Sequence, residues 1–134
     1  MKINFKHIDI RNFLSLGDNI SLDLDNDGYT LISGRNNDAR DNAASNGSGK
    51  SSILNAICWT LTGETINGLS QNIVNINSSG GCCCTLFFSI DKDNYEITRY
   101  REDKKFGNDL KIKINDEDKS GKGLRESQAI LNQY

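Results

Sequence analysis

A glycine-rich loop set between an extended segment and an apolar segment constrains this chain more than any other feature. The loop comprises Asn46, Gly47, Ser48, Gly49, Lys50, Ser51 and Ser52. Residues 29–33, a β-type run ending in a glycine, predict a short buried strand before it. Apolar residues recur after it at helical spacing: Ile53, Leu54, Ile57, Cys58 and Leu61. Strand, loop and helix in this order predict an α/β fold.

The residue types of the loop are those that hold a nucleoside triphosphate. Gly47 and Gly49 allow the backbone to approach phosphate oxygens without Cβ clashes, and the following helix N-terminus carries partial positive charge. Lys50 would reach the β- and γ-phosphates, and the Ser51 hydroxyl would hold Mg²⁺. We expect Ser52 to assist at the α-phosphate. The sequence therefore predicts a site for ATP or GTP with Mg²⁺.

The loop departs from the strict pattern G-x-x-x-x-G-K-[ST]. Ala44 stands where the first glycine belongs, and Gly34 is interpreted as that glycine, displaced by an insertion at residues 35–45. The insertion is either a tolerated surface loop or a segment that folds over the nucleotide or a dimer partner, bringing Arg35 or Arg40 near phosphate. A chance Gly/Ser turn is the alternative for the whole motif, and the strand and helix around it argue against that.

The rest of the chain is predominantly β. We expect strands at residues 2–10, 20–24, 82–90, 95–101 and 110–114, a hairpin turn at 91–94, and a closing helix at 124–131. Residues 64–81 are polar and predict a loop. This organisation predicts one domain over residues 1–134, with a mixed sheet, one main helix after the phosphate loop and a β-rich flank.

Charge and cysteine content exclude some classes of protein. The net charge of −2 gives no general case for a basic nucleic-acid surface, although a local patch stays open. The cysteines, Cys58, Cys82, Cys83 and Cys84, do not follow metal-ligand spacing, so we expect reduced thiols. No apolar run is long enough to span a membrane, and we expect a cytosolic protein.

Hydrolysis needs a carboxylate that supports Mg²⁺, normally at the end of an apolar strand. No such Walker B aspartate is found. The carboxylates after the loop stand in polar contexts: Glu64, Asp91, Asp93, Glu96, Asp103 and Asp116. We therefore expect the catalytic half to lie outside this chain.

Three blocks together carry a family resemblance. These are IRNFLSLGDNISLDL with the pair Asn12 and Phe13, the loop through Ser51, and the helix ILNAICWTLTG. They resemble the N-terminal lobe of the SMC-like repair ATPases, which include SbcC-type nuclease-associated ATPases and phage recombination endonuclease ATPase subunits. The resemblance covers nearly the whole chain.

The resemblance implies a larger assembly. In the family, a long coiled coil joins this lobe to a C-terminal lobe that holds the signature motif and Walker B. Two heads sandwich ATP, and a complex with a nuclease subunit processes DNA ends. It also implies an intracellular protein of phage or bacterial type, with little ATPase activity in this lobe alone. Family members often have an arginine where this chain has Leu14, and Arg11 or Arg35 would have to replace its contact.

Two other functions remain open. A transport-type ABC ATPase shares the phosphate loop, but the Asn12–Phe13 pair and the hairpin-rich region favour the SMC-like class. A non-hydrolysing module that pairs with a full-length head is the second alternative, and exchange into a heterodimer without hydrolysis would support it.

Smaller features are given structural interpretations. His7 is expected to be structural, because the sequence places no serine, cysteine or aspartate beside it. Trp59 is expected to pack in the core or an interface. The basic cluster between residues 99 and 105 either contacts DNA phosphates or, as we favour, forms a solvated hairpin: Arg99, Arg101, Lys104 and Lys105.

Overall fold

The computed structural model describes residues 1–17, 19–25, 50–68, 70–75, 78 and 80–134. Its described strands form one sheet in the order β2-β1-β3-β4-β5-β6, and every pairing among them is antiparallel. The strands are β1 (Ile3–Arg11), β2 (Ile20–Asp23), β3 (Cys82–Ile90), β4 (Asp93–Asp103), β5 (Gly107–Ile114) and β6 (Glu117–Asp118). The helices are α1 (Lys50–Thr62) and α2 (Leu124–Leu131).

Most elements lie where the sequence pattern predicts them. The α/β class, the main helix after the loop, five of the expected strands and the closing helix are confirmed. The expected strand at residues 29–33 lies outside the described residues. The two-residue strand β6 was not expected, because so short a run carries no alternation.

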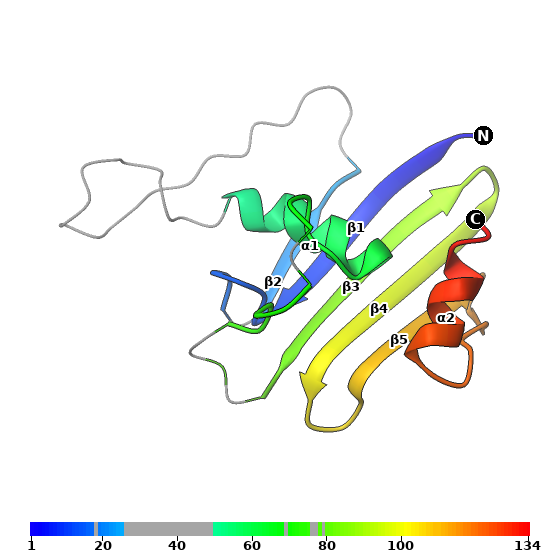
Figure 1. The fold of residues 1–134 in the computed structure, drawn as a ribbon. Coiled ribbons are helices and arrows are strands. Elements are labelled where there is room, and N and C mark those ends of the chain that lie inside the picture. Colours follow the sequence, from blue (N-terminus) through cyan, green and yellow to red (C-terminus); the bar gives the residue numbers. More distant parts are fainter. Residues whose placement is uncertain (18, 26–49, 69, 76–77, 79) are drawn as a thin grey trace.

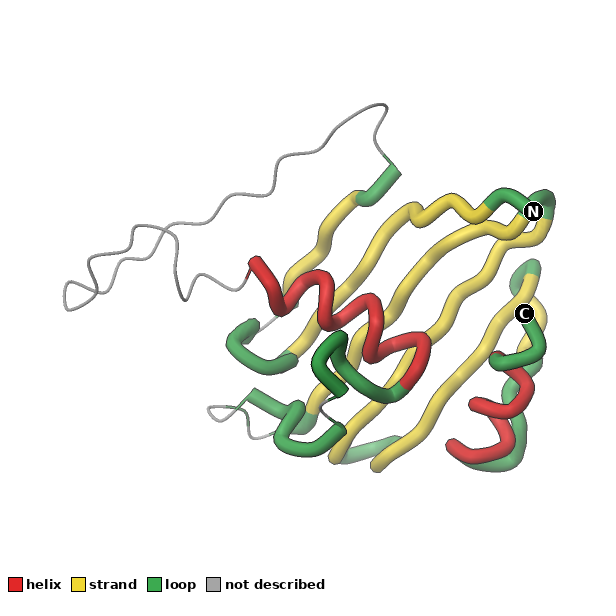
Figure 2. The backbone as a smooth tube through the Cα atoms, turned by 45° about the horizontal axis from the view of Figure 1, so that its top comes forward, coloured by secondary structure: helices red, strands yellow, loops and turns green. Residues whose placement is uncertain are grey.

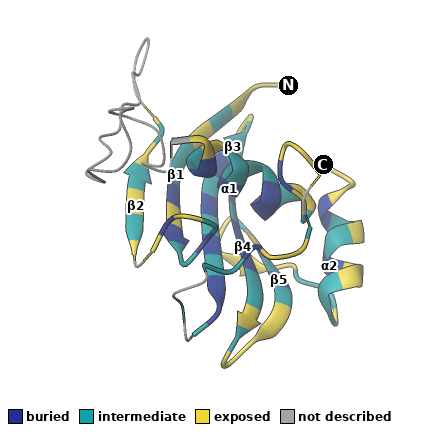
Figure 3. Ribbon diagram, turned by 60° about the vertical axis from the view of Figure 1, so that its left-hand side comes forward, coloured by how far each residue is buried: buried dark blue, intermediate teal, exposed yellow. Residues whose placement is uncertain are grey.

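One face of the sheet forms the core. Alternate residues of each strand point to this face, so β1 contributes Ile8 and Ile10 while β3 contributes Cys84 and Leu86, all at most 1% exposed. Figure 3 shows the buried segments running along the middle strands beneath α1. The opposite face carries polar and part-buried residues.

Helix α1 lies across the core face, over β3 and β4 (Figures 1 and 2). Of its own residues, Ala56, Trp59 and Thr60 are fully buried. The expected apolar stripe also contacts the core, since Ile53, Ile57 and Leu61 are part-buried against it. Leu54, which widens that stripe, is 53% exposed.

Helix α1 ends before a glycine, and α2 packs on another part of the sheet. Gly63 follows α1 with φ +85°, and its N–H donates to the Trp59 carbonyl at 2.7 Å, which confirms the expected helix end. Helix α2 packs on β5 at the far end of the sheet (Figure 1). Neither of these helices is long and apolar enough to cross a membrane.

Candidate functional site

The first residues of the phosphate loop, Asn46, Gly47, Ser48 and Gly49, lie outside the described residues, as does the insertion at 35–45. The structure begins again at Lys50, which is the first residue of α1. The helix N-terminus thus follows Gly49 at once, which is the arrangement that a phosphate cradle requires. The Ser51 residue is exposed at this end of the helix.

Ser52 occupies a different position from Ser51. It is 6% exposed, and its hydroxyl oxygen lies 2.9 Å from the hydroxyl oxygen of Ser15, in the loop after β1. A hydroxyl donates once and accepts twice, so this contact leaves Ser52 capacity for a second partner. The first turn of α1 is thereby joined to the loop that carries Asn12 and Phe13.

Phe13 anchors that loop in the core. Its side chain is fully buried, and its ring centroid lies 5.3 Å from that of Trp59 on α1, with an interplanar angle of 40°. Trp59 is likewise fully buried, which confirms its expected packing role. The pair therefore fixes the end of β1 against the helix that follows the phosphate loop.

The backbone of the same loop is tied down on both sides. Asn12 and Leu14 have positive φ angles, +55° and +49°, and the Asn12 amide donates to the Gly81 carbonyl at 3.2 Å. The Leu14 N–H donates to the Ile73 carbonyl at 2.8 Å. Leu14 itself is part-buried against the core. The loop is a fixed support beside the first turn of α1.

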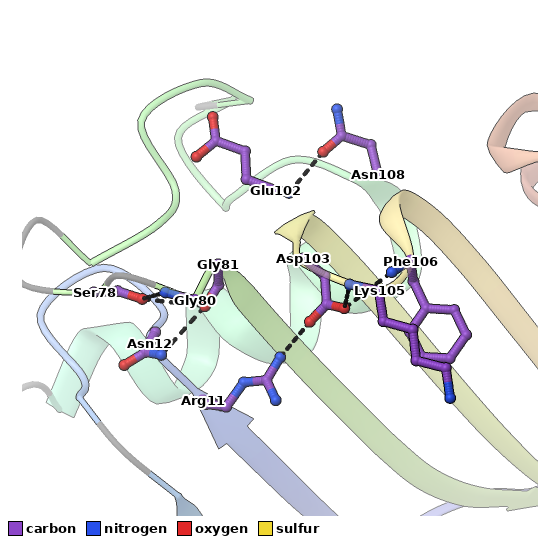
Figure 4. A network of polar contacts seen from close by, with 10 residues as sticks. All are labelled: Arg11, Asn12, Ser78, Gly80, Gly81, Glu102, Asp103, Lys105, Phe106 and Asn108. Atoms are coloured by element: carbon purple, nitrogen blue, oxygen red, sulfur yellow. Dashed lines mark hydrogen bonds and ion pairs between the residues drawn. The ribbon is translucent and has the colours of Figure 1, made fainter.

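Arg11, a candidate for the phosphate contact that Leu14 cannot make, forms an ion pair with Asp103 instead (Figure 4). Its Nη2 donates to Asp103 Oδ1 at 2.5 Å, while Asp103 Oδ2 accepts the backbone N–H groups of Lys105 and Phe106, both at 3.0 Å. Although burial acts to raise the Asp103 pKa, these two N–H groups and Arg11 outweigh it and lower that pKa. Arg11 is thus the ion-pair partner of a hairpin carboxylate, and Arg35 lies outside the described residues.

His7 has the partners that sequence reasoning did not place. Its Nδ1 lies 2.7 Å from Asp23 Oδ1 and its Nε2 2.8 Å from Asp9 Oδ1, while the Ser21 hydroxyl lies 2.8 Å from Nε2 and donates to Asp9. Hydrogen bonds from Asp23 and then Asp9 raise the His7 pKa. These contacts all lie within the β1–β2 pair, which favours the structural interpretation. Asp9 is two residues from His7 on one strand, so strand alternation could have placed it beside the ring, whereas Asp23 and Ser21 depend on the pairing register of β1 and β2.

The solvated-hairpin interpretation is wrong for Arg99. This residue is 4% exposed and lies beneath α1, where its Nε donates to the Thr60 carbonyl at 3.0 Å and its Nη2 to Gln128. Its Cζ lies 5.9 Å from the centre of the Trp59 ring. Alternation along β4 placed it on the core face, where an arginine was not anticipated.

The cysteines are free thiols. Burial raises the pKa of Cys83 to about 11, and Cys84 is also shifted upward, mainly by burial. Thiols of this kind are unreactive near neutral pH. In the described ranges, no three histidine, cysteine or acidic side chains gather as metal ligands.

Comparison with known proteins gives a family and a set of relatives. A family model described as an AAA domain matches residues 7–133. The DNA double-strand break repair Rad50 ATPase of Archaeoglobus fulgidus is 39% identical over 98 residues, which make up 72% of this chain and 10% of the relative. This chain therefore spans about a tenth of that protein.

Two solved structures share the fold. The recombination mediator protein RecF with ATP aligns with a TM-score of 0.59 and 21% identity, over 98% of this chain and 31% of RecF. A second RecF structure, of the ATPrS form, aligns with a TM-score of 0.51 and 16% identity, over 89% and 28% of the two chains. The sheet and helices described above thus recur within larger chains.

Proposed function

This chain belongs to the AAA domain family, and we propose that it is the ATP-binding N-terminal lobe of an SMC-like ATPase that acts in DNA recombination or double-strand-break repair. The relative at 39% identity is named as a DNA double-strand break repair ATPase, which supports the repair assignment over the transport-type alternative. The position of α1 directly after the glycine-rich loop supports nucleotide binding.

The residues of the loop would contact different parts of Mg²⁺-ATP. The backbone N–H groups of residues 46–49 and the α1 N-terminus would surround the phosphates, and Lys50 would neutralise the β- and γ-phosphates. Ser51, exposed at the helix start, would hold Mg²⁺. Ser52 would reach the α-phosphate while Ser15 fixes its hydroxyl.

The half-site proposal rests on the missing Walker B aspartate. On α1, Ile53, Ile57 and Leu61 are part-buried and pack against the core, while Leu54 is 53% exposed. A C-terminal lobe of the same head would cover Leu54 and supply the Mg²⁺-supporting carboxylate. A second head, a nuclease subunit and DNA would complete the assembly.

The test is equilibrium binding of Mg²⁺-ATP to this chain and to a Lys50→Ala variant. Loss of one charge-assisted contact to phosphate corresponds to about a tenfold or greater loss of affinity. Lys119→Ala is the matched control, because Lys119 pairs with Glu117 at the other end of the sheet. We expect the control to bind ATP as the unmodified chain does.

Equal ATP affinity in all three proteins would contradict the proposed role of the loop. Repeating the titration without Mg²⁺, and with Ser51→Ala, separates the cation contribution from that of the loop. Ser51→Ala should remove most of the Mg²⁺ dependence and leave the Mg²⁺-free affinity unchanged.

A further inference from the structure

A cavity of about 380 Å³ lies between the end of α1, strand β4 and helix α2, at the opposite end of α1 from Lys50. Three arginines line it: Arg99, Arg101 and Arg125. Glu64 is the one carboxylate among its described lining residues. The amides of Gln128 and Asn132 and the Thr62 hydroxyl add further polar groups to the wall.

Arg99 is the innermost of these cations. Its described partners are uncharged: the Thr60 carbonyl, the Gln128 amide oxygen and the face of Trp59. It forms no ion pair with any carboxylate in the described part of the chain. Burial and then the nearby charge of Arg101 lower its pKa to about 10. Arg99 and Arg101 thus line one cavity, and neither forms an ion pair within the described residues.

The protein supplies only part of the missing negative charge. The carbonyl end of α1, where Thr60 accepts from Arg99, is equivalent to roughly half a negative charge. Glu64 supplies one more, and it is exposed, so water screens it. Arg125 is exposed as well, and water screens it in the same way. The buried Arg99 and the part-buried Arg101 are therefore the two cations whose charge the protein leaves incompletely neutralised.

We propose that this cavity binds a phosphate group, at a site separate from the ATP phosphate loop. Guanidinium forks match phosphate oxygens with paired N–H donors. Arg101 and Arg125 line the cavity, and Arg101 gives one of its N–H groups to the Ser70 carbonyl at 3.1 Å, which leaves its other donors for a ligand. The first turn of α2 also lines it through Leu124 and Arg125, and its cap residue, Gly123, has no side chain to occupy the first-turn N–H groups.

A nucleotide in the phosphate loop cannot be the occupant. Lys50 begins α1 and the cavity lies at the other end of this helix, whose 13 residues span about 20 Å. The phosphate would instead belong to a free anion, a second nucleotide or a nucleic-acid backbone. All three sources present the same phosphate group, and the experiment below distinguishes them.

The experiment titrates inorganic phosphate into the chain carrying Lys50→Ala, so that the phosphate loop contributes as little as possible. Calorimetry reports binding, and fluorescence of Trp59, the only tryptophan, reports the surroundings of Arg99. We expect saturable binding that weakens about tenfold with Arg101→Gln and with Arg125→Gln. Lys113→Gln, on β5 and paired with Glu96, should leave the affinity unchanged.

Parallel titrations use ATP and a short single-stranded oligonucleotide. The ligand that binds most tightly identifies the source of the phosphate. Thermal unfolding of each variant confirms that the fold is retained. Binding that is insensitive to both arginine substitutions overturns the proposal, as does tighter binding of succinate than of phosphate. Every protein in this experiment carries Lys50→Ala, so the result does not depend on ATP binding at the phosphate loop. The phosphate-cavity proposal and the ATP-site proposal can therefore fail independently of each other.

Discussion

At the scale of single residues, Phe13 gives the Asn12–Phe13 pair a physical meaning. Its ring fills the space between the end of β1 and Trp59, and neither ring is exposed. The asparagine beside it closes the loop through the Gly81 carbonyl. The sequence named both residues by resemblance, but only the packing shows that they support the first turn of α1.

Phe13→Ala should therefore lower the free energy of unfolding by about 3–5 kcal/mol, because it leaves a cavity in the core. Phe106→Ala is the matched control: Phe106 is 39% exposed and stacks on Tyr100 at the surface. Chemical denaturation of the two variants measures the difference. Equal losses would show that Phe13 is not a core anchor.

His7 makes a second prediction at this scale, in the dependence of stability on pH. Hydrogen bonds to Asp23 and Asp9 raise its pKa above the ordinary value of 6.5. The protonated imidazole therefore stabilises the fold fully below pH 6.5, and this contribution is lost as the pH rises through the higher pKa of the folded state. His7→Gln should abolish that dependence.

The measurement is simple because the chain has a single histidine. An NMR titration of its imidazole signals gives the folded-state pKa directly. A value at or below 6.5 would contradict the hydrogen-bond network at β1 and β2.

At the scale of elements, periodicity predicted which segments form helices and strands but not which residues pack most deeply. In α1 the spacing of Ile53, Ile57 and Leu61 predicted the buried stripe, and these residues do pack against the core. The deepest positions are nevertheless Ala56 and Trp59, which the apolar spacing did not single out. The pairing register of the strands decides which side chains from different strands meet, and no local sequence pattern encodes which strands are neighbours.

Gly81 tests how closely the loop before β3 approaches the β4 hairpin. Its φ is +79°, and a Cβ there would lie 2.2 Å from the Glu102 carbonyl oxygen. Gly81→Ala should lower the free energy of unfolding by more than about 2 kcal/mol. Gly80→Ala, where a Cβ meets nothing within 4 Å, should cost less than about 1 kcal/mol. Comparable losses from both would rule out the close approach.

At the scale of the whole molecule, the described strands form one antiparallel sheet, with α1 packed across its core face. Length and composition predicted one domain, and the order of strand, glycine-rich loop and helix predicted the α/β class. Neither indicated that Arg99 would lie beneath the helix, since a charged residue on a strand is normally solvated. Its burial becomes visible only once α1, β4 and α2 are packed together.

We propose that this chain binds ATP and needs a C-terminal lobe to hydrolyse it. ATP binding and steady-state phosphate release, measured on the same sample with Mg²⁺ present, test it most directly. We expect ATP binding that Lys50→Ala weakens, and no phosphate release above that of the Lys50→Ala variant. Robust turnover by the unmodified chain, lost in Lys50→Ala, would contradict the half-site account.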